Sequence, residues 1–315
     1  MKIVLLESLG IPGELLEELT APLTAAGHTF AVYERTTDEA KLIEECRDAD
    51  VLMLANMPLP GSVIRACEHL KYINIAFTGV DHVDMAAAKE KGLAVSNAAG
   101  YATQAVAELT IGQMISLLRN VNATECQCRR GGTKNGLVGS ELGGRTVGVI
   151  GTGAIGQRVA RLCGAFGCKM LGYAPRPKEE AKQWLTYVSL EELLKESDIV
   201  ALHCPLTGET RGMIGAAELA MMKPGSYLIN MARGPVVDSE ALAAALNSCH
   251  LAGAAVDVFE QEPPIPQQHP LLNARNCRVT PHIGFASKQS MALRARIVFD
   301  ALNGWLEGRE VNRVL

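Results

Sequence analysis

Thr146-Val-Gly-Val-Ile-Gly-Thr-Gly-Ala-Ile-Gly156 is the stretch of sequence that decides the fold. Its apolar first half predicts a buried strand, and residues 157–166 have the pattern of a helix. The Gly-x-Gly-x-x-Gly spacing between a strand and a helix is typical of a dinucleotide-binding turn. Gly151 would permit the tight turn, Gly153 the approach of a pyrophosphate, and Gly156 close packing of helix on strand. A pyrophosphate would then lie at the free N–H groups of a helix N-terminus.

Short apolar runs alternate with amphipathic stretches on both sides of this motif. Such alternation predicts parallel sheets covered by helices. From the motif onward the sequence predicts six buried strands, which is the number in a complete doubly wound dinucleotide fold. These strands are expected at residues 146–150, 170–173, 199–203, 226–231, 253–258 and 278–280.

The first third of the chain has a similar pattern of its own. Five apolar runs, at residues 3–7, 30–33, 51–55, 72–77 and 94–96, alternate with helical patterns. A last helical pattern, 287–306, cannot begin a third domain, so we expect it to return to the first. The sequence therefore predicts an α/β protein with two Rossmann-like, doubly wound parallel-sheet domains and an active-site cleft between them. A substrate-binding domain is expected at 1–97 plus 286–315, and a dinucleotide-binding domain at 98–285.

Composition restricts the classes of partner. The 315 residues carry a net charge of −4, which indicates no strong field for nucleic acid or an anionic membrane. The sequence has no apolar run of 18 residues, the length that indicates a membrane span. Nine scattered cysteines predict reduced thiols rather than a disulfide framework, and the spacing of Cys126 and Cys128 does not suit a metal pair. We expect a soluble, cytoplasmic protein that binds no metal, nucleic acid or membrane.

The residues after the second strand of the nucleotide domain bear on the choice of cofactor. An Asp or Glu for the ribose 2′-hydroxyl is expected about 20 residues beyond the glycines. Ala174 takes that place, and Arg176 and Lys178 follow it. Because a guanidinium binds a phosphate bidentately, this pattern favours NADP over NAD. The alternative is that both cations are solvated and NAD binds without the carboxylate.

Three chemically active side chains follow the ends of later strands. Arg233, Glu262 and His282 would meet at the carboxyl edge of the sheet, where ligands of α/β proteins bind. A histidine can donate a proton near neutral pH, and a carboxylate can stabilise its charged form. An arginine can bind a substrate carboxylate and polarise the adjacent carbonyl. The set predicts hydride transfer between a nicotinamide and C2 of a small 2-keto or 2-hydroxy acid, although each residue alone has a structural explanation.

The sequence resembles the D-isomer-specific 2-hydroxyacid dehydrogenase family over nearly its whole length. The segment Asn97-Ala-Ala-Gly-Tyr-Ala-Thr103 most resembles the glycerate/hydroxypyruvate (glyoxylate) reductase and phosphoglycerate dehydrogenase-like members. The other matching segments are Gly151–Gly156, His203-Cys-Pro-Leu-Thr207, Asn230-Met-Ala-Arg-Gly234, Ala255-Val-Asp-Val-Phe259, Glu262-Pro263 and Pro281-His-Ile-Gly284.

The resemblance implies roles for individual residues of the nucleotide domain. The catalytic set would be Arg233, Glu262 and His282. Asp257 would bind the nicotinamide amide, unless it only caps a loop. The cofactor-binding residues would be Gly151, Gly153, Ala154, Ile155, Gly156, Arg176, His203, Pro205, Thr210, Met231, Ala232, Asp257, Gly284 and Val106.

In the first domain, residues 76–84 resemble the family's substrate loop. Backbone N–H groups at Thr78 and Gly79 would hold the substrate carboxylate, as Arg233 does from the other domain. Tyr101 would line the pocket, and Phe77, where many members have glycine, would crowd it.

The family resemblance and a long apolar helical pattern at 102–118 with a polar tail at 119–135 also predict a homodimer. The alternative for this pattern is a helix that connects the two domains. A different class of protein, a nicotinamide-sensing corepressor on the same fold, is the alternative function. A protein that only senses the coenzyme needs no proton donor, so the Arg, Glu and His set favours the enzyme.

Overall fold

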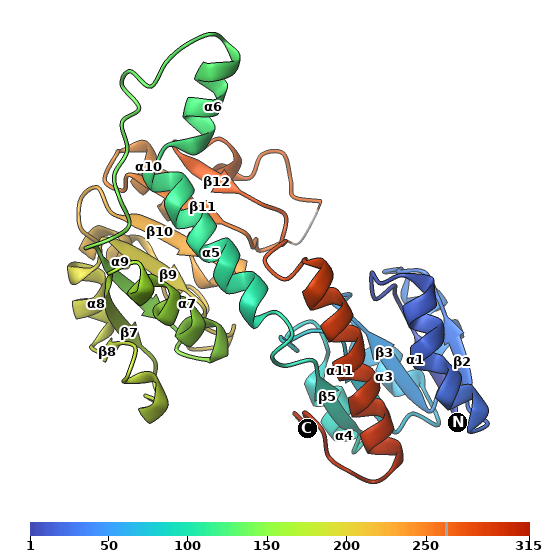
Figure 1. Ribbon diagram of the computed structural model, residues 1–315. Helices are drawn as coiled ribbons and strands as arrows, with labels where there is room; N and C mark the ends of the chain where they lie inside the picture. Colours follow the sequence, from blue (N-terminus) through green and yellow to red (C-terminus); the bar gives the residue numbers. More distant parts are fainter. Residues whose placement is uncertain (262–263) are drawn as a thin grey trace. The chain divides into compact units, whose positions relative to one another are not determined.

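The computed structural model describes residues 1–261 and 264–315, which divide into two units (Figure 1). The first unit comprises Met1–Ala102 and Ala286–Leu315, and the second comprises Thr103–Phe285. Each unit contains a parallel sheet with helices, so the prediction of two parallel-sheet α/β domains is confirmed.

The first unit has a five-stranded sheet in the order β2-β1-β3-β4-β5. All its strand pairs are parallel. Every residue of β3 and β4 is buried, which is why both strands are apolar along nearly their whole length. The strands are β1 (Lys2–Leu5), β2 (Thr29–Val32), β3 (Val51–Leu54), β4 (Tyr72–Ile75) and β5 (Ala94–Asn97).

The last helix belongs to this first unit. The amide of Asn74 on β4 donates to the carbonyl of Val298, 2.7 Å away. The final residues then pair with the edge strand β5, where the N–H of Val314 donates to the carbonyl of Val95 over 2.8 Å. This covers an otherwise open sheet edge. The helices are α1 (Gly13–Ala25), α2 (Glu39–Cys46), α3 (Gly61–Ala66), α4 (Met85–Glu90) and α11 (Lys288–Leu306).

The second unit has a seven-stranded parallel sheet in the order β12-β11-β10-β9-β6-β7-β8. The strand order reverses between β6 and β9, the point at which ligands of such sheets bind. Six strands were expected from the sequence, and β8 is additional. The strands are β6 (Thr146–Ile150), β7 (Lys169–Tyr173), β8 (Thr186–Tyr187), β9 (Ile199–Leu202), β10 (Tyr227–Asn230), β11 (Gly253–Val256) and β12 (Cys277–Val279).

Helices of the second unit flank this sheet, and α5 packs along α7. By contrast, α6 buries none of its residues, and it extends away from the sheet of its unit (Figure 1). Within the described residues, no helix combines the length and apolar character needed to cross a membrane. The helices are α5 (Thr103–Leu118), α6 (Val121–Arg129), α7 (Ala154–Ala165), α8 (Leu190–Glu196), α9 (Ala216–Met221) and α10 (Ser239–Asn247), with 3-10 turns at Glu179–Ala181, Gly234–Val236 and Pro270–Leu272.

Candidate active site

The glycine-rich turn between β6 and α7 leaves no room for side chains at two positions. A Cβ on Gly151, where φ is +94°, would lie 2.4 Å from the backbone nitrogen of Cys204. A Cβ on Gly156 would lie 2.0 Å from the carbonyl oxygen of Gly151. Gly153 differs, because nothing lies within 4 Å of the place its Cβ would occupy. The turn is therefore packed on its inner side and open at Gly153, as a bound pyrophosphate requires.

The start of α7 provides the donors for that anion. Gly153 is the N-cap, so no side chain caps the first turn, in which Ala154 is exposed and Ile155 is half-buried. Helix N-termini of this kind present unsatisfied N–H groups and a positive dipole end. The Gln157 amide steadies the turn by donating to the carbonyl of Thr152 over 3.0 Å. The residues present fit a dinucleotide pyrophosphate.

A buried imidazole lies beside this turn, directly after β9. Both ring nitrogens of His203 are buried and find no hydrogen-bond partner among the described residues. Burial lowers the pKa of His203 to about 4, so the ring is neutral at physiological pH. The following loop is held by Thr210, whose hydroxyl donates to the carbonyl of Pro205 over 2.6 Å. His203, Pro205 and Thr210 thus lie at the end of β9, beside the point where the strand order reverses.

Arg176 lies in the segment that follows β7 and is exposed. Among the described residues it makes no hydrogen bond and no ion pair. Lys178 differs, because its Nζ lies 4.0 Å from a carboxylate oxygen of Glu180. Arg176 is therefore the cation of this segment that is available to an anionic ligand.

Asp257 controls the shape of the loop that carries His282. Its carboxylate accepts hydrogen bonds from the Thr280 hydroxyl (2.5 Å) and from the N–H groups of Ile283 (2.9 Å) and Gly284 (2.7 Å). Burial raises the pKa of this carboxyl group above its usual value. A carboxylate has about four acceptor sites, so about one is left for a ligand. The loop-capping role considered from the sequence is present, and it leaves room for an amide donor.

Four residues expected to bind the cofactor meet at Gly284. A Cβ there would lie 2.9 Å from Oδ2 of Asp257, 3.2 Å from Cε of Met231 and 3.5 Å from Cγ2 of Val106. These atoms come from the ends of β10 and β11 and from α5. Together they form an apolar surface with one carboxylate, a pattern that suits a flat ring bearing an amide.

His282 lies in this loop with an unusual backbone conformation. Its φ is +54°, a region that residues other than glycine rarely adopt and that is found at functional sites. The conformation is held by its N–H, which donates to the carbonyl of Asp257 over 2.7 Å. The half-buried ring meets Phe285 edge-to-face, with centroids 5.4 Å apart. Glu262, the expected carboxylate partner, lies outside the described residues.

Arg233 follows β10 in an extended conformation and is half-buried. One of its guanidinium nitrogens donates to the carbonyl of the buried residue Ala232 over 2.8 Å. The next residue must be glycine, because a Cβ on Gly234 would lie 1.9 Å from the carbonyl carbon of Phe259. This close approach brings the loops after β10 and β11 together and so fixes the position of the Arg233 backbone.

In the first unit, the expected substrate loop follows β4. The amide of Asn97 donates to the carbonyl of Thr78 over 2.7 Å, and the side chain of Asp84 caps α4 through the N–H of Ala87 over 2.9 Å. Thr78 is exposed and Gly79 half-buried. The loop is held by its own contacts, with Thr78 at the surface of its unit.

Tyr101, which was expected to line the pocket, is buried and only 3% exposed. Its ring centroid lies 6.3 Å from that of Phe77, and the guanidinium carbon of Arg294 lies 5.7 Å from the Tyr101 ring centroid. Tyr101 therefore joins Phe77 and the buried cation Arg294 at this end of the first sheet. Phe77 is also buried, so it fills the interior beneath the loop.

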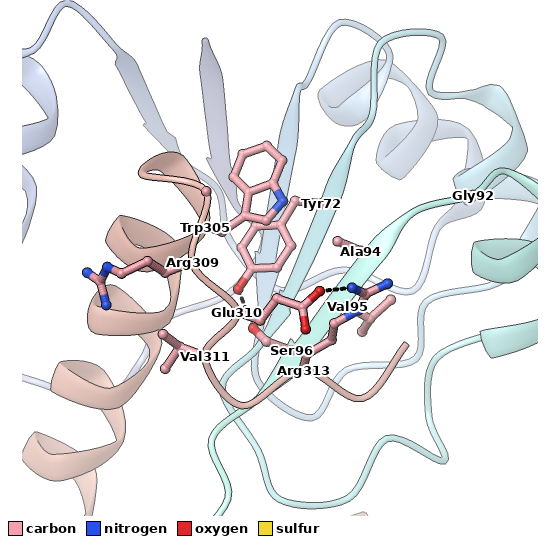
Figure 2. Close-up of a pocket in the computed structure, with 11 residues that line it drawn as sticks. Tyr72, Gly92, Ala94, Val95, Ser96, Trp305, Arg309, Glu310, Val311 and Arg313 are labelled. Atoms are coloured by element: carbon pink, nitrogen blue, oxygen red, sulfur yellow. Dashed lines mark hydrogen bonds and ion pairs between the residues drawn. The ribbon is translucent and has the colours of Figure 1, made fainter.

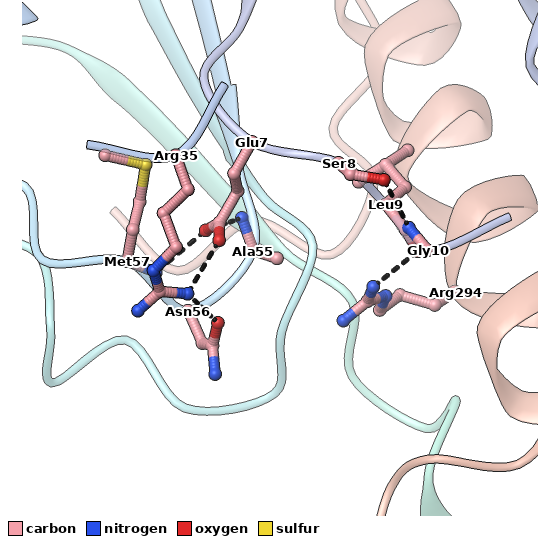
Figure 3. Close-up of polar contacts among 9 residues, drawn as sticks. All are labelled: Glu7, Ser8, Leu9, Gly10, Arg35, Ala55, Asn56, Met57 and Arg294. Atoms are coloured by element: carbon pink, nitrogen blue, oxygen red, sulfur yellow. Dashed lines mark hydrogen bonds and ion pairs between the residues drawn. The ribbon is translucent and has the colours of Figure 1, made fainter. Parts of the chain in front are cut away.

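Sequence reasoning missed two buried charges at this end of the first sheet (Figure 3). Glu7 accepts hydrogen bonds from the N–H groups of Ala55 (2.8 Å) and Met57 (2.7 Å) and from Arg35 (2.9 Å). Arg294 donates to the carbonyl of Leu9 over 2.6 Å. A glutamate placed directly after an apolar strand is the signal that could have revealed Glu7. Both residues shape the loops at the carboxyl ends of β1 and β3.

A cavity of about 260 Å³ in the first unit has a different character (Figure 2). It lies along the edge strand β5 and is lined by Tyr72, Ala94–Ser96 and residues of the C-terminal segment such as Trp305 and Arg313. Ligands of parallel sheets bind instead at the carboxyl ends of the strands. Its cations Arg309 and Arg313 form ion pairs with neighbouring glutamates. The cavity is therefore separate from the candidate active site.

Comparison with known proteins agrees with this geometry. Residues 111–284, more than half of the chain, match the family model described as D-isomer specific 2-hydroxyacid dehydrogenase, NAD binding domain. A hydroxypyruvate reductase from Blautia hydrogenotrophica is 36% identical, with 100% of this chain and 99% of the relative covered. A D-lactate dehydrogenase from Aquifex aeolicus, complexed with NAD and lactic acid, superposes with a TM-score of 0.86 at 30% identity over 98% of this chain and 96% of that one. An acyclic imino acid reductase in complex with NADPH and D-Arg superposes with a TM-score of 0.91 at 26% identity, with both chains fully covered.

Proposed function

Because the chain belongs to the D-isomer-specific 2-hydroxyacid dehydrogenase family, we propose that its activity depends on Arg233, Glu262 and His282 around a nicotinamide bound at Gly284. The protein is a nicotinamide-dependent oxidoreductase that acts on the CH–OH group of 2-hydroxy acids or, in reverse, reduces 2-keto acids. The observation that carries the residue assignment is the meeting of Val106, Met231 and Asp257 at Gly284, two residues beyond His282.

Each side chain has a distinct part in the reaction. A nicotinamide held at Gly284 would supply or accept the hydride at C2 of the substrate. His282 donates a proton to the substrate oxygen during reduction and removes it during oxidation. Glu262 stabilises the charged imidazole. Arg233 binds the substrate carboxylate and polarises the neighbouring C=O bond.

Positioning of His282 depends on Asp257 in this proposal. The Asp257 carboxylate and carbonyl hold the backbone of residues 282–284 through hydrogen bonds of 2.7–2.9 Å. A remaining acceptor site on the carboxylate would bind the carboxamide of the nicotinamide. The same residue would then set the position of both the proton donor and the coenzyme.

The preferred coenzyme is NADP in our proposal. The support is Arg176, which is exposed and makes no hydrogen bond or ion pair within the described parts of the chain. No carboxylate follows β7 at the place where an NAD-specific site would have one. The guanidinium would bind the 2′-phosphate bidentately.

The substrate is, in our proposal, a small 2-keto acid such as hydroxypyruvate or glyoxylate. The hydroxypyruvate reductase among the relatives supports this class. The backbone N–H groups of Thr78 and Gly79 would bind the carboxylate together with Arg233. Tyr101 and Phe77, which are both buried, would limit the space for the substrate side chain from beneath the loop.

We also propose a homodimer located in the cytoplasm. Helix α6 buries none of its residues; Val121, its first residue, is 44% exposed, and Val138, in the loop that follows, is 80% exposed. Exposed apolar side chains on a helix and the following loop favour contact with a second copy. The cysteines of the described residues are all free thiols, as a reducing compartment would keep them.

The test is a panel of 2-keto acids assayed with NADH and NADPH by the loss of absorbance of the reduced coenzyme. We expect turnover of hydroxypyruvate or glyoxylate with a lower KM for NADPH. Turnover of neither acid with either coenzyme would contradict the proposed substrates, and a lower KM for NADH would contradict the proposed coenzyme.

A further inference from the structure

The C-terminal end of α7 has a specific hydrogen-bonded form. Gly167 follows the helix with φ at +84°. The N–H of Cys168 donates to the carbonyl of Cys163 over 3.1 Å, and the N–H of Gly167 donates to the carbonyl of Gly164 over 2.9 Å. These two bonds and the left-handed glycine define a Schellman motif.

This motif brings two side chains together, namely those at the third-last helical position and at the second residue beyond the cap. They are usually a pair of apolar residues. Here they are Cys163 and Cys168, whose thiols lie close enough for each to shift the pKa of the other. The backbone bond between the two residues holds their Cα atoms close, as a disulfide requires (about 4.4–6.8 Å).

The two thiols differ in their access to solvent. Cys163 is completely buried, and its sulfur lies 3.9 Å from that of Met114 on α5. Cys168 is only partly buried, and its sulfur lies 3.3 Å from the carbonyl oxygen of Leu142. A reagent from solvent would therefore reach Cys168 first, and the buried Cys163 would be available to react with it next.

The charges around the pair favour the same order. Interaction with the Cys163 thiol and the positive charge of Arg145 hold the pKa of Cys168 below its usual value. The pKa of Cys163 is raised by its interaction with Cys168 and by burial. Since the thiolate is the nucleophile, Cys168 is the reactive member of the pair and Cys163 its partner.

We propose that Cys163 and Cys168 form a hydroperoxide-responsive dithiol site at the C-terminal end of α7. The Cys168 thiolate attacks one peroxide oxygen, an S–O bond forms as the O–O bond breaks, and the departing oxygen takes a proton to leave as water or an alcohol. The sulfur of Cys163 then attacks the resulting sulfenic acid. An S–S bond forms, the S–O bond breaks, and the departing hydroxide takes the proton of the Cys163 thiol and leaves as water.

This second step keeps Cys168 from irreversible oxidation. A sulfenic acid that meets a neighbouring thiol condenses to a disulfide, which a dithiol can reduce, whereas one without a partner proceeds to sulfinic acid. The glycine-rich turn lies at the other end of the 12-residue helix, about 18 Å away. The disulfide is therefore compatible with coenzyme binding, and the inference does not depend on the proposed substrate or coenzyme.

A second pair of thiols in the first unit provides an internal comparison. Cys46 and Cys67 also shift each other's pKa, but both are completely buried. If contact between thiols were enough, both pairs would oxidise alike. Because access is also required, we expect Cys46 and Cys67 to stay reduced under mild peroxide treatment.

The test uses the whole folded protein, hydrogen peroxide as the probe, and peptide mass spectrometry. Trypsin cleaves after Arg161 and Lys169, so Cys163 and Cys168 fall in one peptide, residues 162–169. We expect this peptide to lose two hydrogen atoms before the exposed thiols Cys126, Cys128 and Cys249 are oxidised, and to regain them with dithiothreitol. Coenzyme affinity, measured separately by fluorescence, should be the same before and after oxidation.

Two variants separate the proposed steps. Cys163→Ala should leave Cys168 without a partner, so that residues 162–169 gain oxygen as sulfinic acid instead of losing hydrogen. Cys168→Ser should leave Cys163 reduced, and Cys46→Ala is the control that should not alter the peptide's oxidation. The proposal is overturned if residues 162–169 stay reduced while the exposed cysteines oxidise, or if Cys168 gains oxygen equally in the wild type and in Cys163→Ala.

Discussion

At the scale of single residues, the site depends on backbone that is held by one buried carboxylate. Asp257 accepts three hydrogen bonds from the segment 280–284, and its carbonyl accepts the N–H of His282. The left-handed conformation of His282 would cost free energy in an isolated loop. These bonds offset that cost, so the direction of the imidazole is set before a substrate binds.

His203 should make the stability of the coenzyme-free protein depend on pH. Its pKa is about 4 when folded and near 6.5 when unfolded, so between these values the unfolded state binds more protons. The free energy of unfolding should therefore be highest above pH 6.5. It should fall by up to about 3 kcal/mol as the pH drops through that range. Urea unfolding at pH 7 and pH 5 measures the difference.

The His203→Gln variant removes the titrating ring from this position and should flatten the profile. His69→Gln, at an exposed position, is the matched control and should leave the profile as in the wild type. An unchanged pH dependence in His203→Gln would show that this imidazole is not the cause.

Arg176→Ala tests the choice of coenzyme. Loss of the guanidinium removes a charge-assisted contact worth about 1.5–3 kcal/mol, so the KM for NADPH should rise by about tenfold or more. The KM for NADH should stay the same, because NADH has no 2′-phosphate. Lys178→Ala is the control, since Lys178 already lies near Glu180. Equal effects of Arg176→Ala on both coenzymes would contradict the assignment.

Single residues could be predicted from the sequence where their role follows from neighbouring residues, but not where it depends on contacts between distant parts of the chain. Arg233 and His282 follow apolar strands in recognisable segments, so the sequence alone indicated them. The hydrogen bonds of Glu7 join residues about 50 positions apart in the chain, and no local pattern predicts them. The meeting of Val106 with Gly284 likewise depends on the packing of α5 on the second sheet.

At the scale of elements, two glycines of the turn from β6 to α7 should affect different properties: one should affect stability and the other coenzyme binding. Gly156→Ala would place a Cβ 2.0 Å from the Gly151 carbonyl oxygen. Overpacking of this kind costs about 1–3 kcal/mol, which a urea unfolding curve would measure. Gly153→Ala has free space around its Cβ, so it should keep its stability but weaken coenzyme binding.

Gly164→Ala is the matched control on the same helix. Nothing lies within 4 Å of its Cβ position, and alanine is the better helix former by about 1 kcal/mol. This variant should be as stable as the wild type or more stable, with the same coenzyme affinity. If Gly153→Ala bound coenzyme as tightly as Gly164→Ala, the proposed place of the pyrophosphate would be wrong.

Strands with a clear apolar run could be predicted from the sequence, whereas the short strand β8 could not. The six strands expected in the second unit correspond to β6, β7, β9, β10, β11 and β12. The missing strand β8 has only two residues, Thr186 and Tyr187, and neither is completely buried. A two-residue strand has no period to detect, and it forms because β7 offers a free edge.

At the scale of the whole molecule, the chain leaves the first unit at Ala102 and returns to it at Ala286. The return was predictable, because a single amphipathic helix cannot form a core of its own. Hydrogen bonds hold α11 in place: the Asn74 amide on β4 donates to the carbonyl of Val298, and Arg294 donates to the carbonyl of Leu9 in the loop after β1. The order of strands in each sheet was less accessible, since it depends on crossovers between distant segments.

Dimer formation is the prediction at this scale. Sedimentation equilibrium of the wild type should give the mass of two chains. Val138→Asp would put a charge at a side chain that is 80% exposed and should weaken the dimer by about tenfold or more, or about 1.4 kcal/mol. Leu293→Asp, at an exposed position on α11, is the control and should stay dimeric. A monomeric wild type would contradict the proposal.

The most direct test of the proposed mechanism is the turnover number of His282→Asn beside that of the wild type, with the 2-keto acid that the panel identifies. Loss of a general acid lowers kcat by about 10²–10⁴-fold, while coenzyme affinity measured by fluorescence should not change. A variant that binds coenzyme normally and turns over at the wild-type rate would contradict the assignment of His282 as the proton donor.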